Sequence, residues 1–244
     1  MSGVPEQFGR AEILIGAQGL ARLADAHVFV AGLGGVGSWC AEALARAGVG
    51  RLTLVDHDQV AVSNINRQLP ALLSTVGRDK AAVMAERIQD IHPECVLHAD
   101  TRFIDPDNID RVLPACDYVV DCIDSLNCKV ALIATARQRG LPVAASMGAG
   151  NKTNPGRVRL ADISATSVCP LAREVRQRLR RLGIHDGVMT VFSDEPGRPP
   201  RPPEATSHGR ARAVNGTISY LPPLFGLMLA GAVIRDLLGD AISS

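Results

Sequence analysis

The chain has 244 residues, of which 26 are Lys or Arg and 25 are Asp or Glu, so its formal net charge is +1. This balance excludes a protein that binds nucleic acid through its overall charge, and a nucleic-acid partner would have to meet a local basic patch. The length fits one α/β domain with an ample core, and we expect residues 1–244 to form a single domain.

The N-terminal segment, residues 1–7, contains no apolar run, which argues against a secretory signal peptide and favours a cytoplasmic location. The longest apolar stretch runs from Ile218 to Ile234, contains Pro222 and Pro223, and is shorter than the roughly 20 residues that cross a membrane. We therefore expect a packed C-terminal helix here and no membrane span.

Predicted strands and helices alternate along the first two thirds of the chain. The strands are expected at 27–31, 51–56, 95–100, 117–123 and 142–146, and the helices at 35–47, 78–91, 106–113 and 125–139. Repeated βαβ units predict a Rossmann-like α/β fold, with a doubly wound, mainly parallel sheet and helices on both faces. Further strands are expected at 157–162 and 188–192.

The stretch from about 194 to 213 is rich in Pro and Arg. Such a composition cannot bury a core, and we expect a mobile crossover loop there.

A glycine-rich turn follows the first predicted strand and opens the first predicted helix. Its glycines are Gly32, Gly34, Gly35 and Gly37. At such a turn the backbone N–H groups of a helix N-terminus can face a phosphate. Asp56 ends the next strand about 20 residues later, where a Rossmann unit places the carboxylate that binds a ribose hydroxyl. The pattern predicts a nucleotide site; the alternative is a turn that only reverses the chain.

The polar segment after Asp56 bears on which nucleotide binds, ATP or NAD. It contains Asp58, Asn64, Asn66, Arg67 and Gln68, and Lys80 opens the next helix. A guanidinium that binds two oxygens and a compact ammonium suit a triphosphate better than the pyrophosphate of NAD. Neither tyrosine, Tyr118 or Tyr220, has a Lys four residues later, so the Tyr and Lys pair of short-chain dehydrogenases is missing. ATP is therefore favoured.

Six cysteines are scattered singly, at positions 40, 95, 116, 122, 128 and 169. Without a Cys-x-x-Cys pair we expect no structural zinc. Cys122 lies within a predicted strand, where a small buried thiol is far more common than a nucleophile.

The chain resembles the ThiF/MoeB/HesA-type adenylating enzymes, which are related to ubiquitin-activating enzymes. The matching residues are Phe8-Gly9-Arg10, the glycine turn, Asp56-His57-Asp58, Asn64 to Gln68, Val76-Gly77 with Lys80, Met84 to Arg87, Asp121 to Ser125, and Ser146 to Lys152. The second half resembles one branch of this family, the tRNA threonylcarbamoyladenosine dehydratases, through Arg157 to Ser164, Pro170-Leu171 with Arg176 to Arg180, and Val191 to Glu195.

The resemblance implies an enzyme that uses ATP to adenylate a carboxylate and releases pyrophosphate. It implies that Gly34 and its neighbours line the α-phosphate, that Asp56 holds the ribose, that Arg67, Gln68 and Lys80 face the phosphates, and that Asp124 acts through magnesium. The alternative for Asp124 is an N-cap of the following helix, a role that Ser125 could equally fill.

In the dehydratase branch the activated carboxylate belongs to the threonyl group of a modified adenosine beside the tRNA anticodon. A nitrogen of the same side chain displaces AMP, so the nucleophile is already on the substrate. Some of these enzymes have a cysteine before the last helix, where this chain has Asn215, and covalent catalysis by cysteine is not expected. The resemblance makes the tRNA anticodon stem-loop the expected partner, with a sulfur-transfer protein as a further candidate.

Arg10 and a cluster of five arginines are further candidates for contact with anionic ligands. The resemblance implies that Arg10 reaches the ATP phosphates of the partner subunit in a twofold homodimer; the alternative is an ordinary surface arginine. Arginines at 173, 176, 178, 180 and 181 lie on one predicted helix. They are candidates for contact with the tRNA backbone, with a solvated helix face as the alternative.

Two other functions stay open. The first is an adenylyltransferase that activates a small ubiquitin-like or sulfur-carrier protein, against which the missing Cys-x-x-Cys pairs argue. The second is a module that senses NAD or ATP without catalysis, against which the presence of Arg67, Lys80 and Asp124 together argues.

Overall fold

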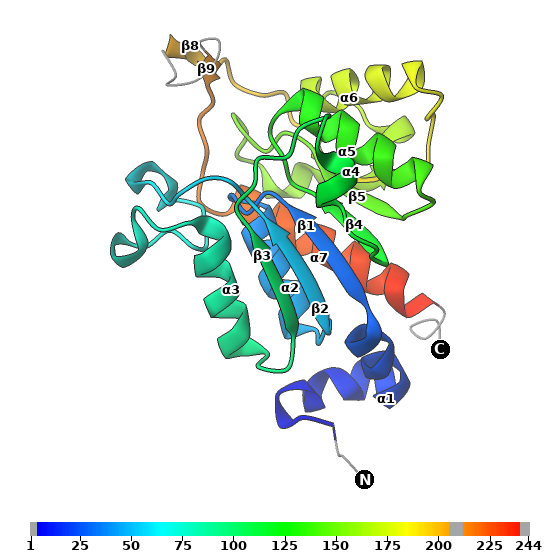
Figure 1. Ribbon diagram of the computed structural model, residues 1–244. Helices are drawn as coiled ribbons and strands as arrows, with labels where there is room; N and C mark the ends of the chain where they lie inside the picture. The colour runs from blue at the N-terminus through cyan, green and yellow to red at the C-terminus, as the bar shows by residue number, and fades with distance from the viewer. Residues whose placement is uncertain (1–3, 205–211, 240–244) are drawn as a thin grey trace.

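The computed structural model describes residues 4–204 and 212–239. Its main sheet has seven strands in the order β3-β2-β1-β4-β5-β7-β6, in which β6 runs antiparallel to β7 and the other neighbours are parallel (Figure 1). The strands are β1 His27–Ala31, β2 Arg51–Val55, β3 Val96–Asp100, β4 Tyr118–Asp121, β5 Val143–Ser146, β6 Val158–Asp162 and β7 Met189–Ser193. The predicted Rossmann-like, mainly parallel sheet is confirmed.

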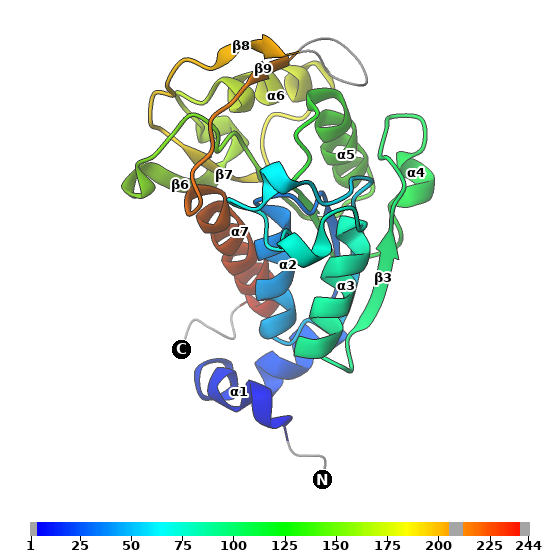
Figure 2. The same ribbon diagram turned by 90° about the vertical axis from the view of Figure 1, so that its left-hand side faces the viewer.

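Helices cover both faces of this sheet. They are α1 Gly9–Asp25, α2 Gly37–Arg46, α3 Lys80–Ile91, α4 Ile109–Val112, α5 Leu126–Gln138, α6 Pro170–Arg181 and α7 Leu221–Leu238, with short 3₁₀ turns at η1 Glu6–Phe8, η2 Val62–Asn64, η3 Leu73–Thr75, η4 Pro155–Arg157 and η5 Ile163–Ala165. One face is covered by α2, α3 and α7, and the other by α4, α5 and α6 (Figure 2). Helix α1 is an addition to the predicted elements.

The central strand β1 contributes to both cores. Val28 and Val30 pack with α2 and α7 on one face, whereas Phe29 and Ala31 pack with α5 on the other, and all four are fully buried. Successive side chains of a strand point to opposite faces. A strand buried on both sides therefore has the continuous apolar sequence seen here.

The turn between β1 and α2 depends on two of its glycines. Gly32 has a φ of +86°, and a Cβ at this residue would lie 2.8 Å from the carbonyl oxygen of Cys122. A Cβ at Gly37 would lie 1.8 Å from the carbonyl oxygen of Gly32. Both positions exclude a larger residue. The turn stays tight, and the N-terminus of α2 reaches the edge of the sheet.

The C-terminal helix α7 is the packed helix expected from the sequence. Pro222 and Pro223 lie in its first turn, where a missing N–H loses no helical hydrogen bond. A Cβ at Gly226 would lie 2.3 Å from the carbonyl oxygen of Val36, so this glycine allows α7 to lie close to α2. The length and apolar composition of α7 would suffice to cross a membrane, and half of it is buried inside the protein. That burial is what a core helix requires.

The Pro- and Arg-rich stretch has more order at its flanks than the sequence predicts. Strands β8 Arg201–Glu204 and β9 Arg212–Val214 pair antiparallel, and the N–H of Arg198 donates to the carbonyl of Asn151 over 2.8 Å. Backbone pairing of this kind needs no apolar core, which is why composition alone did not predict it. The middle of the predicted mobile loop, residues 205–211, lies outside the described residues.

Candidate active site

A cavity of about 830 Å³ opens at the carboxyl ends of the parallel strands. This is the edge of an open α/β sheet at which ligands bind, and the volume suits a small molecule. The sequence-predicted site residues that line it are Gly32, Gly34, Gly35, Asp56, Asp58, Arg67, Gln68, Lys80 and Asp124. Residues far apart in the chain are therefore brought together as expected.

Asp56 ties the glycine turn to the end of β2. Its Oδ2 accepts the N–H of Leu33 over 2.6 Å, and its Oδ1 accepts the N–H of Asp58 over 2.8 Å. Burial raises the pKa of the Asp56 carboxyl, and the nearby Lys80 ammonium partly offsets this effect. Each carboxylate oxygen keeps a second lone pair for a ligand hydroxyl.

Lys80 and Gln68 are buried polar side chains at the same end of the cavity. Lys80 is 4% exposed, and its Nζ lies 2.8 Å from Oδ2 of Asp58. Gln68 is 9% exposed, and its buried Oε1 has no hydrogen-bond partner among the residues described. Because buried polar atoms are almost always paired, this wall of the cavity suits a polar ligand.

Arg67 lies beside the glycine turn. Its guanidinium donates to the carbonyl of Ser63 over 2.9 Å and to Oδ1 of Asn66 over 2.8 Å, and its side chain packs near Gly35. Burial lowers the pKa of Arg67. A guanidinium has five N–H donors, so these two bonds leave donors for a phosphate.

Four predicted site residues do not line the cavity. Gly37 shapes the turn, Oδ1 of Asn64 accepts the N–H of Ala61 over 3.1 Å, and Nδ2 of Asn66 donates to the carbonyl of Thr217 over 3.0 Å. Arg10 lies in α1, at the end of the molecule opposite to β8 and β9 (Figure 1). The two asparagines therefore hold loop backbone at the rim, and Arg10 is remote from the cavity of its own chain.

Asp124 lies three residues after the end of β4, is exposed, and lines the cavity. The N-cap of α5 is Ser125, and Asp124 forms no hydrogen bond with another described residue. Carboxylate oxygen is a preferred ligand of Mg²⁺, so Asp124 fits a metal ligand better than an N-cap.

Ligand atoms of Asp56, His57 and Asp58 also lie within 4.8 Å of one another. The oxygens of Asp56 already accept backbone N–H groups, and Asp58 is paired with Lys80. This cluster is therefore less suited to a metal ion than Asp124.

Comparison with known proteins identifies the family of the chain. The model of the ThiF family matches residues 8–244. The chain belongs to the ThiF family. This ThiF-family chain is 43% identical over 242 residues to the tRNA threonylcarbamoyladenosine dehydratase of Bacillus subtilis, covering 96% of this chain and 95% of that one. It is 46% identical over 198 residues to the Escherichia coli enzyme of the same name, covering 78% and 74%.

Solved structures agree over the full length of the fold. The crystal structure of E. coli tRNA N6-threonylcarbamoyladenosine dehydratase, TcdA, matches with a TM-score of 0.87 and 37% identity, covering 98% of this chain and 97% of that one. Its complex with ATP matches with a TM-score of 0.85, covering 98% and 96%. The predicted family and fold class of this ThiF-family chain are thereby confirmed.

Two buried lysines near the cavity were not predicted as functional residues. Lys129 and Asp121 are both fully buried and lie 2.5 Å apart, and Nζ of Lys129 also donates to the carbonyl of Ser146 over 2.9 Å. Lys152 is 4% exposed, lines the cavity, and donates to the carbonyl of Ser193 over 2.9 Å. The sequence held one indication: lysine occurs only at positions 80, 129 and 152.

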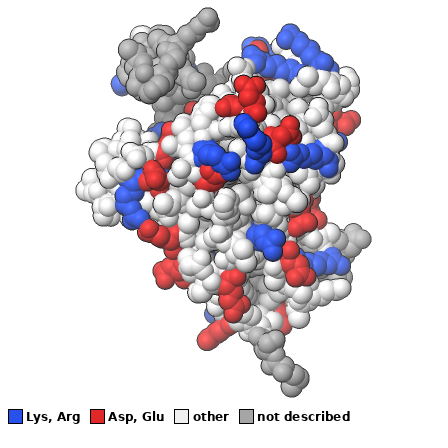
Figure 3. Space-filling view, in the orientation of Figure 1, with Lys and Arg blue, Asp and Glu red and all other residues white. Residues whose placement is uncertain are grey.

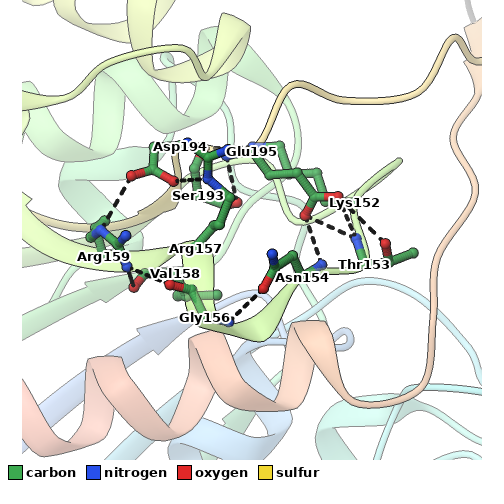
Figure 4. A network of polar contacts seen from close by, with 10 residues as sticks. All are labelled: Lys152, Thr153, Asn154, Gly156, Arg157, Val158, Arg159, Ser193, Asp194 and Glu195. Atoms are coloured by element: carbon green, nitrogen blue, oxygen red, sulfur yellow. Dashed lines mark hydrogen bonds and ion pairs between the residues drawn. The ribbon is translucent and has the colours of Figure 1, made fainter.

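The loop that contains Lys152 is held by the end of β7 and the two residues that follow it, Asp194 and Glu195 (Figure 4). The Glu195 carboxylate accepts the N–H of Thr153 over 3.0 Å and that of Asn154 over 2.8 Å. These bonds lower the pKa of Glu195. Asp194 pairs with Arg157 over 2.8 Å. The carboxylates of Glu195 and Asp194 therefore hold the loop in place, and both already have hydrogen-bond or ion-pair partners.

The arginine-rich segment forms α6, whose first residues line the cavity. Arg176 turns inward and donates to the carbonyl of Thr166 over 2.8 Å. Arg173, Arg180 and Arg181 are exposed, and Figure 3 shows basic side chains at the upper edge of the molecule, where α6 lies. Only part of the predicted cluster is therefore available to a partner.

The cysteines of this ThiF-family chain are free. Cys122 lines the cavity, but burial raises the pKa of its thiol well above the ordinary value, whereas a nucleophilic cysteine needs a lowered pKa. At the rim, Oδ1 of Asn215 accepts from Nδ2 of Asn151 over 2.8 Å. The environments of Cys122 and Asn215 support the prediction that neither Cys122 nor the position of Asn215 supplies a nucleophilic thiol.

Proposed function

We propose that the chain is an ATP-dependent tRNA threonylcarbamoyladenosine dehydratase. It adenylates the carboxylate of the modified adenosine and closes the side chain into a ring with loss of one water. The main support is that the glycine turn, Asp56, Arg67, Lys80 and Asp124 line one cavity in a chain similar over its length to enzymes of that name. The relative TcdA has been crystallised with ATP and with AMP.

In this proposal the glycine turn binds the α-phosphate through backbone N–H groups, and Asp56 accepts a hydrogen bond from the ribose. Arg67, Gln68 and Lys80 bind the outer phosphates. Negative charge grows on these oxygens as pyrophosphate leaves, and fixed cations stabilise it most when they are held in place before the reaction. The contacts of Lys80 with Asp58 and of Arg67 with Asn66 hold these two cations in place.

Asp124 would hold magnesium. When bound, the ion neutralises charge on the phosphate oxygens. The exposed carboxylate of Asp124, which has no protein partner among the described residues, is a suitable ligand for it.

Ring closure needs little from the protein. A nitrogen of the threonylcarbamoyl group attacks the activated carbonyl carbon, the bond to AMP breaks, and the nitrogen loses its proton. Such an intramolecular attack has an effective molarity on the order of 10⁵ M or more. Ring closure therefore needs no cysteine nucleophile, which agrees with Asn215 in place of a cysteine and with the buried thiol of Cys122.

The tRNA anticodon stem-loop would approach over α6. The first residues of α6 line the cavity. The exposed side chains of Arg173, Arg180 and Arg181 on this helix can contact phosphates. A tRNA substrate also favours a cytoplasmic enzyme.

We further propose a twofold homodimer. Large apolar side chains are exposed on α1 and in the loop between β2 and α3: Ile13 is 83% exposed, Leu14 81%, Val62 63% and Leu73 81%. These are two separate sets of exposed apolar side chains, and such exposure is typical of surfaces that contact another protein. In such a dimer Arg10 of the partner subunit would reach the ATP phosphates as an arginine finger.

The reaction tests the function directly. The purified protein with ATP, magnesium and threonylcarbamoylated tRNA should yield AMP, pyrophosphate and a nucleoside lighter by one water, measured by mass spectrometry. Asp124→Ala should reduce the rate by about 10²- to 10³-fold, the effect of removing one preorganised electrostatic contact. Formation of ADP would contradict adenylation, and near-normal turnover by the variant would contradict the role of Asp124.

Subunit exchange tests the role of Arg10. Arg10→Ala and Asp124→Ala should each lose most of the activity when assayed alone. Mixed under conditions that exchange subunits, they should regain activity because one site of each heterodimer has both residues. An inactive mixture that contains proven heterodimers would contradict action in trans.

A further inference from the structure

The three lysines of the chain differ in how their charge is neutralised. All three are buried: Lys80 and Lys152 are 4% exposed, and Lys129 is fully buried. Nζ of Lys80 lies 2.8 Å from Asp58, and that of Lys129 lies 2.5 Å from Asp121. Within the described part of the chain, no carboxylate lies within 4.0 Å of Nζ of Lys152. Lys152 is thus a buried ammonium without a counter-ion.

The nearest carboxylates are committed to other groups (Figure 4). Glu195 accepts backbone N–H groups of Thr153 and Asn154, and Asp194 binds Arg157. An ammonium has three N–H donors, and Lys152 uses one of them on the carbonyl of Ser193. A buried charge without a partner is costly, and burial lowers the pKa of Lys152. An anionic ligand would remove this cost.

The strand order places Lys152 away from the nucleotide end of the cavity. Asp56 follows β2, the glycine turn follows β1, Asp124 follows β4, and Lys152 lies after β5, in that order along the sheet edge. Arg67 and Lys80, the cations suited to phosphates, lie before Asp124 in this order. Lys152 lies beyond it, on the side of the cavity away from these two cations.

A second cavity of about 420 Å³ adjoins this end. Lys152 lies on the wall common to both cavities, which share the residues Asn151, Lys152, Arg198, Pro199 and Thr217. A ligand that enters through the second cavity meets Lys152 on its way to the phosphates.

We propose that Lys152 binds the carboxylate of the threonyl group and holds it for attack on the α-phosphorus. This inference rests on the function proposed above. In the step, a carboxylate oxygen forms a bond to the α-phosphorus and the bond between that phosphorus and pyrophosphate breaks, with no proton transfer. The acyl group then has no negative charge, so its attraction to Lys152 weakens and the carbonyl is free for ring closure.

A binding experiment isolates this contact from the chemistry. Two anticodon stem-loop RNAs are compared, one with threonylcarbamoyladenosine and one in which its carboxylate is replaced by a carboxamide. Affinities are measured by calorimetry with a non-hydrolysable ATP analogue present. The wild type should prefer the carboxylate RNA by about ten- to a hundredfold, as expected for a hydrogen bond to a charged group. Lys152→Met should bind both RNAs equally.

Arg157→Gln is the matched control. It removes a cation from the same network without touching either cavity lining, and it should keep the wild-type preference. Lys152→Met should also keep the wild-type affinity for the ATP analogue and a melting temperature no lower than that of the wild type.

Three results would overturn the inference. The first is a preference for the carboxylate RNA that persists in Lys152→Met. The second is a loss of melting temperature in Lys152→Met together with weaker binding of both RNAs and of the ATP analogue, which would make Lys152 a structural residue. The third is turnover of modified tRNA by this variant with unchanged kcat and KM. A wild type that does not dehydrate the tRNA would instead contradict the proposed function.

Discussion

The two ends of the cavity hold buried positive charge in different ways. Lys80 at the nucleotide end pairs with Asp58, and Lys129, buried beneath the cavity between the ends of β4 and β5, pairs with Asp121. At the end formed after β5 and β7, the one hydrogen-bond acceptor that Nζ of Lys152 reaches among the described residues is the carbonyl of Ser193. A lysine paired within the chain belongs to the folded scaffold, whereas an unpaired one leaves an electrostatic cost that a ligand can relieve. Methionine at each position tests this difference.

The largest effect is expected for Lys129→Met. The change leaves Asp121 fully buried without its partner, and breaking a buried pair in this way costs about 3–5 kcal/mol. Urea unfolding should report this as a lower free energy of unfolding. Adding Asp121→Leu should recover most of the loss, because the second change removes the orphaned charge. Stability equal to the wild type in the single variant would contradict a structural role for the pair.

Lys80→Met should affect binding more than stability. The Asp58 side chain is 53% exposed, so its carboxylate stays hydrated, and the free energy of unfolding should fall by about 1 kcal/mol or less. Affinity for a non-hydrolysable ATP analogue should fall at least about tenfold, since a charge-assisted contact is lost. Calorimetry measures the affinity. Unchanged binding would remove Lys80 from the phosphate site.

The free energy of unfolding of Lys152→Met at neutral pH should equal that of the wild type or exceed it by about 1 kcal/mol. Any such excess should shrink as the pH rises. In the wild type, burial lowers the pKa of Lys152 although Cys169, Glu195 and Asp194 face it and oppose the shift. Between this pKa and the unfolded value of about 10.4 the unfolded chain binds more protons, so wild-type stability rises with pH. Urea titrations from pH 7 to 10 measure the difference in free energy of unfolding between the variant and the wild type. A difference that stays constant over this pH range would contradict this account.

The smallest effect is expected for exposed cations. Arg173→Gln with Arg180→Gln should lower the slope of log affinity for tRNA against log salt by about 1 to 2, because each lost phosphate contact removes up to about 0.9. Arg176→Gln is the contrasting variant, since its guanidinium binds Thr166. It should lower the melting temperature and leave the slope unchanged. If the double variant leaves the slope of log affinity against log salt unchanged, the exposed arginines of α6 form a solvated surface that does not contact tRNA.

The sequence predicted the elements whose periodicity is regular. The buried run of β1 and the glycine turn after it were recognised because each depends on neighbouring residues. Helix α1 was missed because Gly16, with a φ of +68°, interrupts it. The interruption breaks the run of helical periodicity on which such a prediction depends.

The site was predicted less completely than the fold. Asn64 and Asn66 were expected to face the ligand, but their side chains bind backbone at Ala61 and Thr217. The bond from Lys152 to Ser193 joins residues 41 positions apart, and no local pattern reveals such a contact. Residue type and spacing identified the nucleotide end, whereas the opposite end depends on contacts between distant loops.

The packing of α7 on α2 has a consequence for how the protein forms during synthesis. Helix α2 is covered by α7, which lies about 180 residues later in the chain, and Pro222 of α7 also lines the nucleotide cavity. A nascent chain that has not yet added α7 must therefore keep the apolar surface of α2 exposed to the ribosome and to chaperones. Because N-terminal segments emerge first and long-range contacts form late, the competence to bind nucleotide arises only after α7 has been synthesised and has packed on α2.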